Sequence, residues 1–161
     1  MKPIRKVLVA NRGEIAIRIC RTLREMGIRS VAIYSDADQD SPHVFAADEA
    51  HPVGPAPAAQ SYLNKARILE IAAAAGADAI HPGYGFMSES AAFAARVLSA
   101  GLAWIGPSPE AIRALGDKLS ARALAIRAGV PVLSGTEGPV SDPAELRRAA
   151  EKIGYPVVLK A

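Results

Sequence analysis

The sequence has one cysteine, few aromatic residues and no long hydrophobic run, and each shortage excludes a class of protein. Cys20 has no partner for a disulfide within the chain, so we expect a reducing compartment and a role for this residue as a small core side chain. No apolar run approaches the roughly 20 residues of a membrane span, and the N-terminus lacks the apolar region of a signal peptide. We therefore expect a cytoplasmic protein without membrane association.

Aromatic residues make up only 5% of the chain, and its basic residues are interleaved with acidic ones, which disfavours binding to nucleic acid. What is abundant is apolar: 50% of the 161 residues are hydrophobic and 22% are charged, as in a globular protein with one domain or one and part of another. The net charge of +3 suits a nucleotide or phosphate ligand, or simply solubility.

The first motif is a strand, a glycine turn and a helix. Residues 6–10 (KVLVA) form a continuous apolar run, and a periodic helix is expected over residues 14–26. Only Gly13 stands where a dinucleotide fingerprint needs three glycines, so NAD or FAD is disfavoured. The helix is expected to bury Ile15, Ile19, Leu23 and Met26. Its opposite face, which is either solvated or a subunit interface, holds Glu14, Arg18, Arg21 and Glu25.

Acidic residues alternate with short ones after the second expected strand, residues 30–34. Asp36, Asp38 and Asp40 resemble the start of a calcium loop, but the later glycine and glutamate of such a loop are missing. We expect a polar turn that caps a short helix over residues 41–47, and no metal site. The histidines in this region, His43 and His51, are expected on the surface or in packing roles.

Strands and helices then alternate along the chain. Further strands are expected over residues 50–53, 77–80 and 103–105, with helices over residues 64–75, capped by Ser61, and 89–100, burying Phe93, Val97 and Leu98. This alternation predicts an α/β fold with a Rossmann-like open parallel sheet and helices on both faces.

The pattern changes after Pro109. Helices are expected over residues 110–115, 118–128 (capped by Asp117) and 143–153 (capped by Ser141 or Asp142), with a strand-like piece after residue 129 and a buried strand over residues 155–161. The last strand has no visible partner, so we expect an incomplete second domain, with residues 130–161 loosely held, swapped or packed on a neighbour.

Residues 79–89 (AIHPGYGFMSE) organise the chain. They begin as the end of a buried strand, continue as a loop with Pro82, Gly83 and Gly85, and enter a helix with Ser88 as the expected cap. Ligands of doubly wound sheets collect where strand ends meet helix starts. The glycines admit a ligand to the backbone, and Tyr84 offers a hydroxyl and a flat face. An ordinary connection between strand and helix remains the alternative.

Several longer motifs occur together and in order: VLVANRGEIAIRI, GPAPAAQSYLN, AIHPGYGFMSE, WIGPSPEAIRALGDKLSAR and GYPVVLKA. Together they resemble the biotin carboxylase component of biotin-dependent carboxylases, such as acetyl-, propionyl- and methylcrotonyl-CoA carboxylase and pyruvate carboxylase. The resemblance implies a pre-ATP-grasp domain over residues 1–115 and the truncated start of an ATP-grasp domain over residues 116–161.

The resemblance also implies the chemistry of the full-length enzymes. They use ATP and Mg2+ to activate bicarbonate as carboxyphosphate, and the CO2 released carboxylates biotin on a carboxyl carrier protein or domain, from which a carboxyltransferase takes it. The chain lacks the segments implied to supply the metal-binding carboxylates and the catalytic base, so we expect it to be inactive by itself.

Residue roles follow from the same resemblance. Lys118 and Lys160 are implied to contact nucleotide phosphates, although Lys118 could be merely solvated. Residues implied to line the cleft facing biotin and bicarbonate are Tyr84, Gly85 and Glu89. His81 is expected to brace the loop, and residues 11–14 to fix the first turn by hydrogen bonds, with Arg12 as the residue to watch. The helix face with Arg18, Arg21 and Glu25 is implied to make homodimer contacts.

Two other functions stay open. One is another ATP-grasp ligase, of the carbamoyl-phosphate or purine-pathway type, against which the HPGYGF and NRGEIA motifs speak. The other is a non-catalytic assembly module that docks through the face with Arg18, Arg21 and Glu25.

Overall fold

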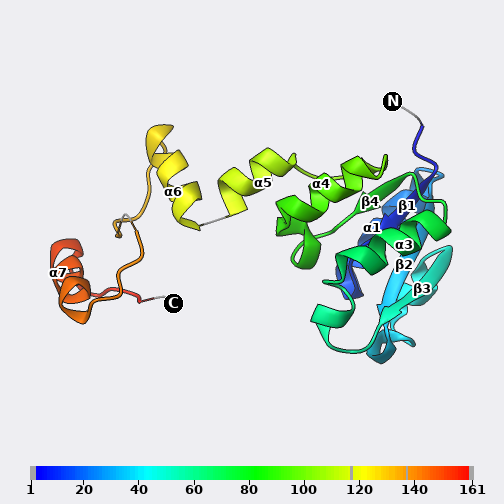
Figure 1. The fold of residues 1–161 in the computed structure, drawn as a ribbon, viewed down its shortest axis with the longest axis horizontal. Helices are drawn as coiled ribbons and strands as arrows, with labels where there is room; N and C mark the ends of the chain where they lie inside the picture. The colour runs from blue at the N-terminus through cyan, green and yellow to red at the C-terminus, as the bar shows by residue number, and fades with distance from the viewer. Residues whose placement is uncertain (1–2, 117, 137, 160–161) are drawn as a thin grey trace. The chain divides into compact units, whose positions relative to one another are not determined.

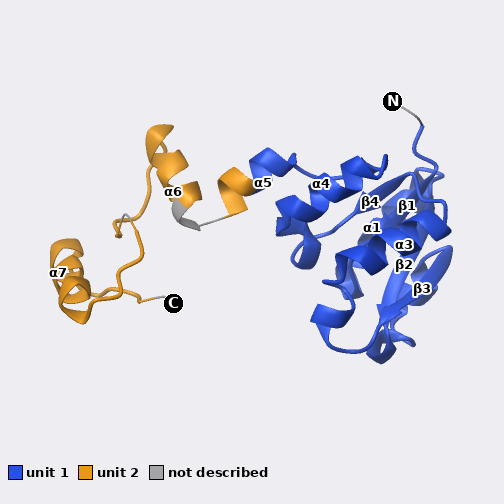
Figure 2. Cartoon of the chain, viewed as in Figure 1, with its two compact units in different colours: residues 1–112 blue, residues 113–161 orange. Residues whose placement is uncertain are grey.

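A computed structural model describes residues 3–116, 118–136 and 138–159. The chain divides into two compact units, residues 1–112 and residues 113–161 (Figures 1 and 2). Within the described residues, every helix is too short or too polar to cross a membrane.

The first unit is built on five parallel strands in the order β3-β2-β1-β4-β5 (Figure 1). This confirms the predicted α/β class and the open parallel sheet. The edge strands are β3, which contains Pro52, and β5, which has two residues. The strand bounds are Lys6–Val9 (β1), Arg29–Ser35 (β2), Glu49–Gly54 (β3), Ala79–His81 (β4) and Ala103–Trp104 (β5).

Helices cover both faces of this sheet because β1 is apolar on both sides. Val7 and Val9 pack in the cluster that contains α1 (Gly13–Glu25), with α2 (Pro42–Ala46) at its margin. The intervening Leu8 and Ala10 face the larger cluster with α3 (Lys65–Ala74) and α4 (Ala91–Ser99). Short 3-10 helices cover Asp36–Asp38 (η1), Ala58–Gln60 (η2) and Phe86–Glu89 (η3). Alternate residues of one strand thus supply two cores.

The helix faces agree with the sequence pattern except at their margins. Cys20 is buried against β1 as expected, whereas the predictions that Met26 and Leu98 are buried were wrong. Met26 follows the last residue of α1. Leu98 lies roughly 90° around α4 from the centre of its buried stripe, at 3.6 residues per turn. The expected cap Ser61 was also wrong, since Asn64 accepts the backbone hydrogen bond that caps α3.

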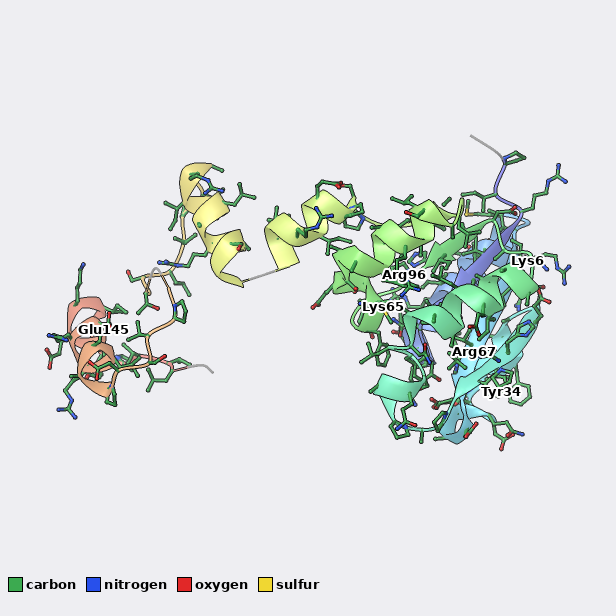
Figure 3. The ribbon with its side chains drawn as sticks, viewed as in Figure 1. Lys6, Tyr34, Lys65, Arg67, Arg96 and Glu145 are labelled. Atoms are coloured by element: carbon green, nitrogen blue, oxygen red, sulfur yellow. The ribbon has the colours of Figure 1, made fainter. Side chains whose placement is uncertain are left out.

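Lys6 fixes the amino edge of the sheet. It is the first residue of β1 (Figure 3). Its ammonium group donates to the carbonyl of Ala75 at 2.7 Å and lies 2.7 Å from the carboxylate of Glu49 on β3. The contact lowers the pKa of Glu49, mainly through the hydrogen bond from Lys6. One side chain therefore ties the central strand to α3 and to the edge strand.

The second unit contains helices rather than a sheet in its described part. It holds the end of α5 (Pro109–Gly116), then α6 (Lys118–Arg127) and α7 (Pro143–Ile153), which Asp142 caps as predicted. The expected strands after residue 129 and over residues 155–161 are not present in the described residues, and Val158 is 90% exposed. A strand pattern needs a neighbouring strand, and the described residues of this unit offer none.

His43 gives the fold a dependence on pH. It is fully buried on α2, its Nε2 lies 3.2 Å from the carbonyl of Ile33, and burial lowers its pKa from the ordinary 6.5. The folded imidazole stays neutral where the unfolded one binds a proton, so its contribution to stability is full above about pH 6.5 and is lost as the pH falls toward the folded pKa.

We therefore expect His43→Gln, which keeps a side-chain donor but does not titrate, to flatten the fall in the urea midpoint between about pH 7.5 and 5.5. Burial also lowers the pKa of His81. That residue is the same in both proteins, so the difference between them isolates His43. Equal slopes for wild type and variant would contradict this expectation.

Candidate functional site

The candidate site lies where the strand order of the sheet reverses. From β1 the chain moves to β2 and β3 on one side, whereas β4 and β5 lie on the other side of β1. In open α/β sheets, ligands bind at the carboxyl ends of the strands flanking such a reversal. Here those ends lead into residues 11–13 after β1 and residues 82–85 after β4.

Asn11 joins these two loops. It is buried, and its side-chain amide donates to the carbonyls of Pro82 at 2.7 Å and Tyr84 at 2.8 Å. Its side-chain oxygen accepts from the backbone N–H of Arg12 at 2.9 Å. The prediction that residues 11–14 fix the first turn by hydrogen bonds is confirmed for Asn11, and the same side chain also holds the loop after β4.

Gly83 allows this close approach. Its φ is +66°, and a Cβ there would lie 2.8 Å from the amide nitrogen of Asn11 and 3.1 Å from Ile15. Its N–H donates to Nδ1 of His81 at 3.0 Å. Because burial lowers the pKa of His81, the ring stays neutral and can accept this bond. The expectation that His81 braces the loop is confirmed.

The loop presents the residues expected to meet a ligand. Tyr84 is 64% exposed, and nothing lies within 4 Å of the position where a Cβ would stand on Gly85. Glu89 is exposed at the end of η3. The expected cap Ser88 was wrong, because η3 intervenes and Ser90 caps α4 by accepting from the N–H of Phe93. The three predicted residues thus share one short segment, residues 84–89.

A buried ionic network beside this loop was missed. Asp38 had been expected in a polar turn; its carboxylate instead accepts two bonds from the guanidinium of Arg12 and one from the hydroxyl of Tyr62. The bond from Arg12, followed by those from Tyr62 and Ser35, lowers the pKa of Asp38 far below its ordinary range. A signal was available: Arg12 and Asp38 follow adjacent parallel strands, whose carboxyl ends lie side by side.

The remaining predicted residues belong to the second unit or to α1. Lys118 is the first residue of α6, in the second unit. Lys160 and the expected cap Asp117 lie outside the described residues. On α1, Glu14 lies 3.3 Å from Arg18 and Arg21 lies 3.7 Å from Glu25, and all four residues are on the exposed face that the sequence pattern predicts.

The hydrogen bonds of Asn11 to the loop after β4 lead to a direct prediction. Asn11→Asp keeps the size of the side chain but turns a buried donor toward two carbonyl oxygens into a carboxylate, so we expect the free energy of unfolding to fall by about 2–3 kcal/mol at neutral pH. Part of the loss should return at low pH, where the protonated acid can donate one bond. Urea unfolding measures both effects.

Asn64→Asp is the matched control. Asn64 also makes a side-chain bond, but as an acceptor at the start of α3, where aspartate caps about as well as asparagine. An Asn11→Asp loss no larger than that of the control would contradict the anchoring role.

Comparison with known proteins agrees with this architecture. Residues 3–112 match the family described as "Biotin carboxylase, N-terminal domain", and residues 117–161 match "Carbamoyl-phosphate synthase L chain, ATP binding domain". Biotin carboxylase of Halalkalibacterium halodurans is 55% identical, over 98% of this chain and 35% of its own length. That of Haemophilus influenzae is 52% identical, over 98% and 36%. The chain therefore spans about a third of the length of these relatives.

Solved structures give the same result. The biotin carboxylase domain of a thermophilic 2-oxoglutarate carboxylase bound to bicarbonate superposes with a TM-score of 0.83 at 47% identity, over 98% of this chain and 35% of that one. The corresponding domain dimer from Hydrogenobacter thermophilus, in complex with MgADP, ADP and bicarbonate, gives 0.88 at 45%, over 97% and 34%. With its N-terminal two-thirds matched in sequence and its parallel sheet matched in space, the chain belongs to the biotin carboxylase N-terminal domain family.

Proposed function

We propose that this chain supplies the N-terminal domain, and the opening of the ATP-binding domain, of a biotin carboxylase. That enzyme carboxylates biotin on a carrier protein with bicarbonate and ATP, through carboxyphosphate. The observation behind the proposal is the loop that Asn11 holds at the reversal of strand order, with Tyr84 exposed. The names of the relatives support the same reaction.

Each predicted site residue has a role in this proposal. Tyr84 offers a ring and a hydroxyl to biotin, and the open space at Gly85 lets a flat ureido ring or bicarbonate approach the backbone. Glu89 supplies a carboxylate at the end of the same segment. Lys118 and Lys160 contact the phosphates of ATP as mobile point charges. Mg2+ accompanies ATP and neutralises phosphate charge when bound.

The proposed partners are a biotin carboxyl carrier protein or domain, a carboxyltransferase and a second copy of the chain. The exposed face of α1 with Arg18, Arg21 and Glu25 is the proposed homodimer contact. The Hydrogenobacter thermophilus domain is described as a dimer, which supports a second copy as a partner. We place the enzyme in the cytoplasm, with acetyl-CoA carboxylation for fatty acid biosynthesis as one of the pathways it would serve.

A chimera tests the function. This chain would replace the matching N-terminal third of Haemophilus influenzae biotin carboxylase, and ATP hydrolysis would be measured with bicarbonate, with and without free biotin. We expect biotin to stimulate hydrolysis, and Tyr84→Ala to lower kcat/KM for biotin about tenfold. Tyr34→Ala, on β2, is the control. A folded chimera that binds ATP but does not respond to biotin would overturn the proposal.

A second candidate is another ATP-grasp ligase, favoured by the match of residues 117–161 to a carbamoyl-phosphate synthase domain. Assay of the full-length protein separates the two functions, because biotin should stimulate ATP hydrolysis only in a biotin carboxylase and ammonia only in a carbamoyl-phosphate enzyme. For a purely assembling module, sedimentation would change with Arg21→Ala while neither substrate had any effect.

A further inference from the structure

Asp38 is the centre of a network at the carboxyl edge of the sheet. Its carboxylate accepts from the guanidinium of Arg12, from the hydroxyl of Ser35 at 2.9 Å and from the hydroxyl of Tyr62 at 2.7 Å. A buried carboxylate with this many donors holds each of them in place.

Tyr62 is the member of the network that reaches the loop. It is 2% exposed, and besides donating to Asp38 its hydroxyl accepts from the N–H of Ser35 at 3.0 Å. Its ring stacks on that of Phe86, with centroids 5.3 Å apart and planes at 26°. Arg12 lies 5.9 Å from the centroid of the same ring. Tyr62 is therefore fixed at its hydroxyl end and touches the loop with its ring.

Phe86 has a strained backbone conformation. Its φ is +44°, and it is the one non-glycine residue with positive φ in the described part of the chain. An L-residue adopts this region only when its surroundings compensate for the strain. Phe86 is also 37% exposed, so burial alone gives limited compensation. The stacked ring of Tyr62 is the specific contact that favours this conformation.

We propose that Arg12, Asp38 and Tyr62 form a positioning unit that holds Phe86, and with it residues 84–89, in the conformation that presents Tyr84, Gly85 and Glu89. None of the three members of the unit needs to touch a substrate. The unit acts by setting the backbone of η3 and of the turn before it. Its importance for catalysis rests on the function proposed above, whereas the conformational effect does not.

Residue-level amide hydrogen exchange of the 161-residue chain tests the proposal. Two backbone bonds report on the segment: Ser88 N–H to the carbonyl of Gly85 at 2.9 Å, and Ser90 N–H to that of Met87 at 3.1 Å. Phe86→Ala removes the ring but keeps a Cβ and hence the strain. We expect it to speed exchange at these two amides about threefold to tenfold and to leave the amides of β1 unchanged.

The controls separate positioning from general destabilisation. Phe45→Ala removes an exposed ring from α2 and should leave the two reporter amides unchanged, whereas Phe86→Tyr keeps the stack and should exchange like wild type. Tyr62→Phe keeps the ring but frees it from Asp38; it should speed the reporter amides, while Tyr34→Phe should not.

Unchanged reporter amides in both Phe86→Ala and Tyr62→Phe would overturn the proposal, and so would an equal increase at the reporter amides and throughout β1. No ATP or biotin enters the measurement. The positioning role can therefore fail while the chimera still responds to biotin, and the reverse can also occur.

Discussion

Asp38→Ala is expected to lower the free energy of unfolding by about 3 kcal/mol, because removing the buried carboxylate leaves the hydroxyl groups of Tyr62 and Ser35 and the guanidinium of Arg12 without their acceptor. The Asp38 side chain is 6% exposed and that of Arg12 is 48% exposed. Since the freed guanidinium can turn toward water, the fall in the free energy of unfolding should be smaller than for an ion pair in which both partners are buried. Urea unfolding at neutral pH measures it.

Asp40→Ala is the matched control, since Asp40 lies nearby but is exposed. The stability of the wild-type protein should also fall at acidic pH. The depressed pKa of Asp38 means that its contribution is present above the ordinary value of 3.8 and is lost as the pH falls through and below it. The variant should lack that part of the acid dependence. Similar losses in Asp38→Ala and Asp40→Ala would refute the network as a source of stability.

Gly83→Ala is expected to cost about 3 kcal/mol from two sources. A positive φ costs an alanine about 1–2 kcal/mol. The new methyl group would also lie 2.8 Å from the side-chain nitrogen of Asn11, which is buried and bonded to two carbonyls and so cannot move away freely. The displaced anchor should release the loop, which thermal or urea unfolding and amide exchange at Ser88 would show.

Gly76→Ala is the control that measures the cost of positive φ alone. Gly76 has φ +63°, close to that of Gly83, but nothing lies within 4 Å of its missing Cβ. The free energy of unfolding of this variant should fall by only about 1 kcal/mol. Equal losses in Gly76→Ala and Gly83→Ala would show that Asn11 yields without cost and that the close approach is unimportant.

The framework of the first unit could be predicted because its signals are local. Residues 7–10 are apolar on both faces, as a central parallel strand requires, and the glycines and proline of residues 82–85 mark the loop after β4. Longer-range features were only partly accessible. Arg12 was recognised as a residue of interest, but Asp38 was assigned to an ordinary turn because its partners Arg12 and Tyr62 are distant in sequence.

Other differences come from context that a short pattern lacks. Ser88 and Ser90 are both reasonable helix caps, and only the 3-10 turn over Phe86–Glu89 decides between them. The apolar run from Tyr155 satisfies strand propensity, but propensity without a pairing strand does not make a sheet.

The borders of the five-stranded sheet also bear on aggregation. At one border Pro52 has no N–H to offer a further strand, and at the other β5 presents only Ala103 and Trp104. Such borders give an incoming chain little backbone to pair with, a known protection against fibre growth. When copies of this domain meet, pairing of their sheets through these two borders is therefore disfavoured, which leaves side chains on helices to make the contacts.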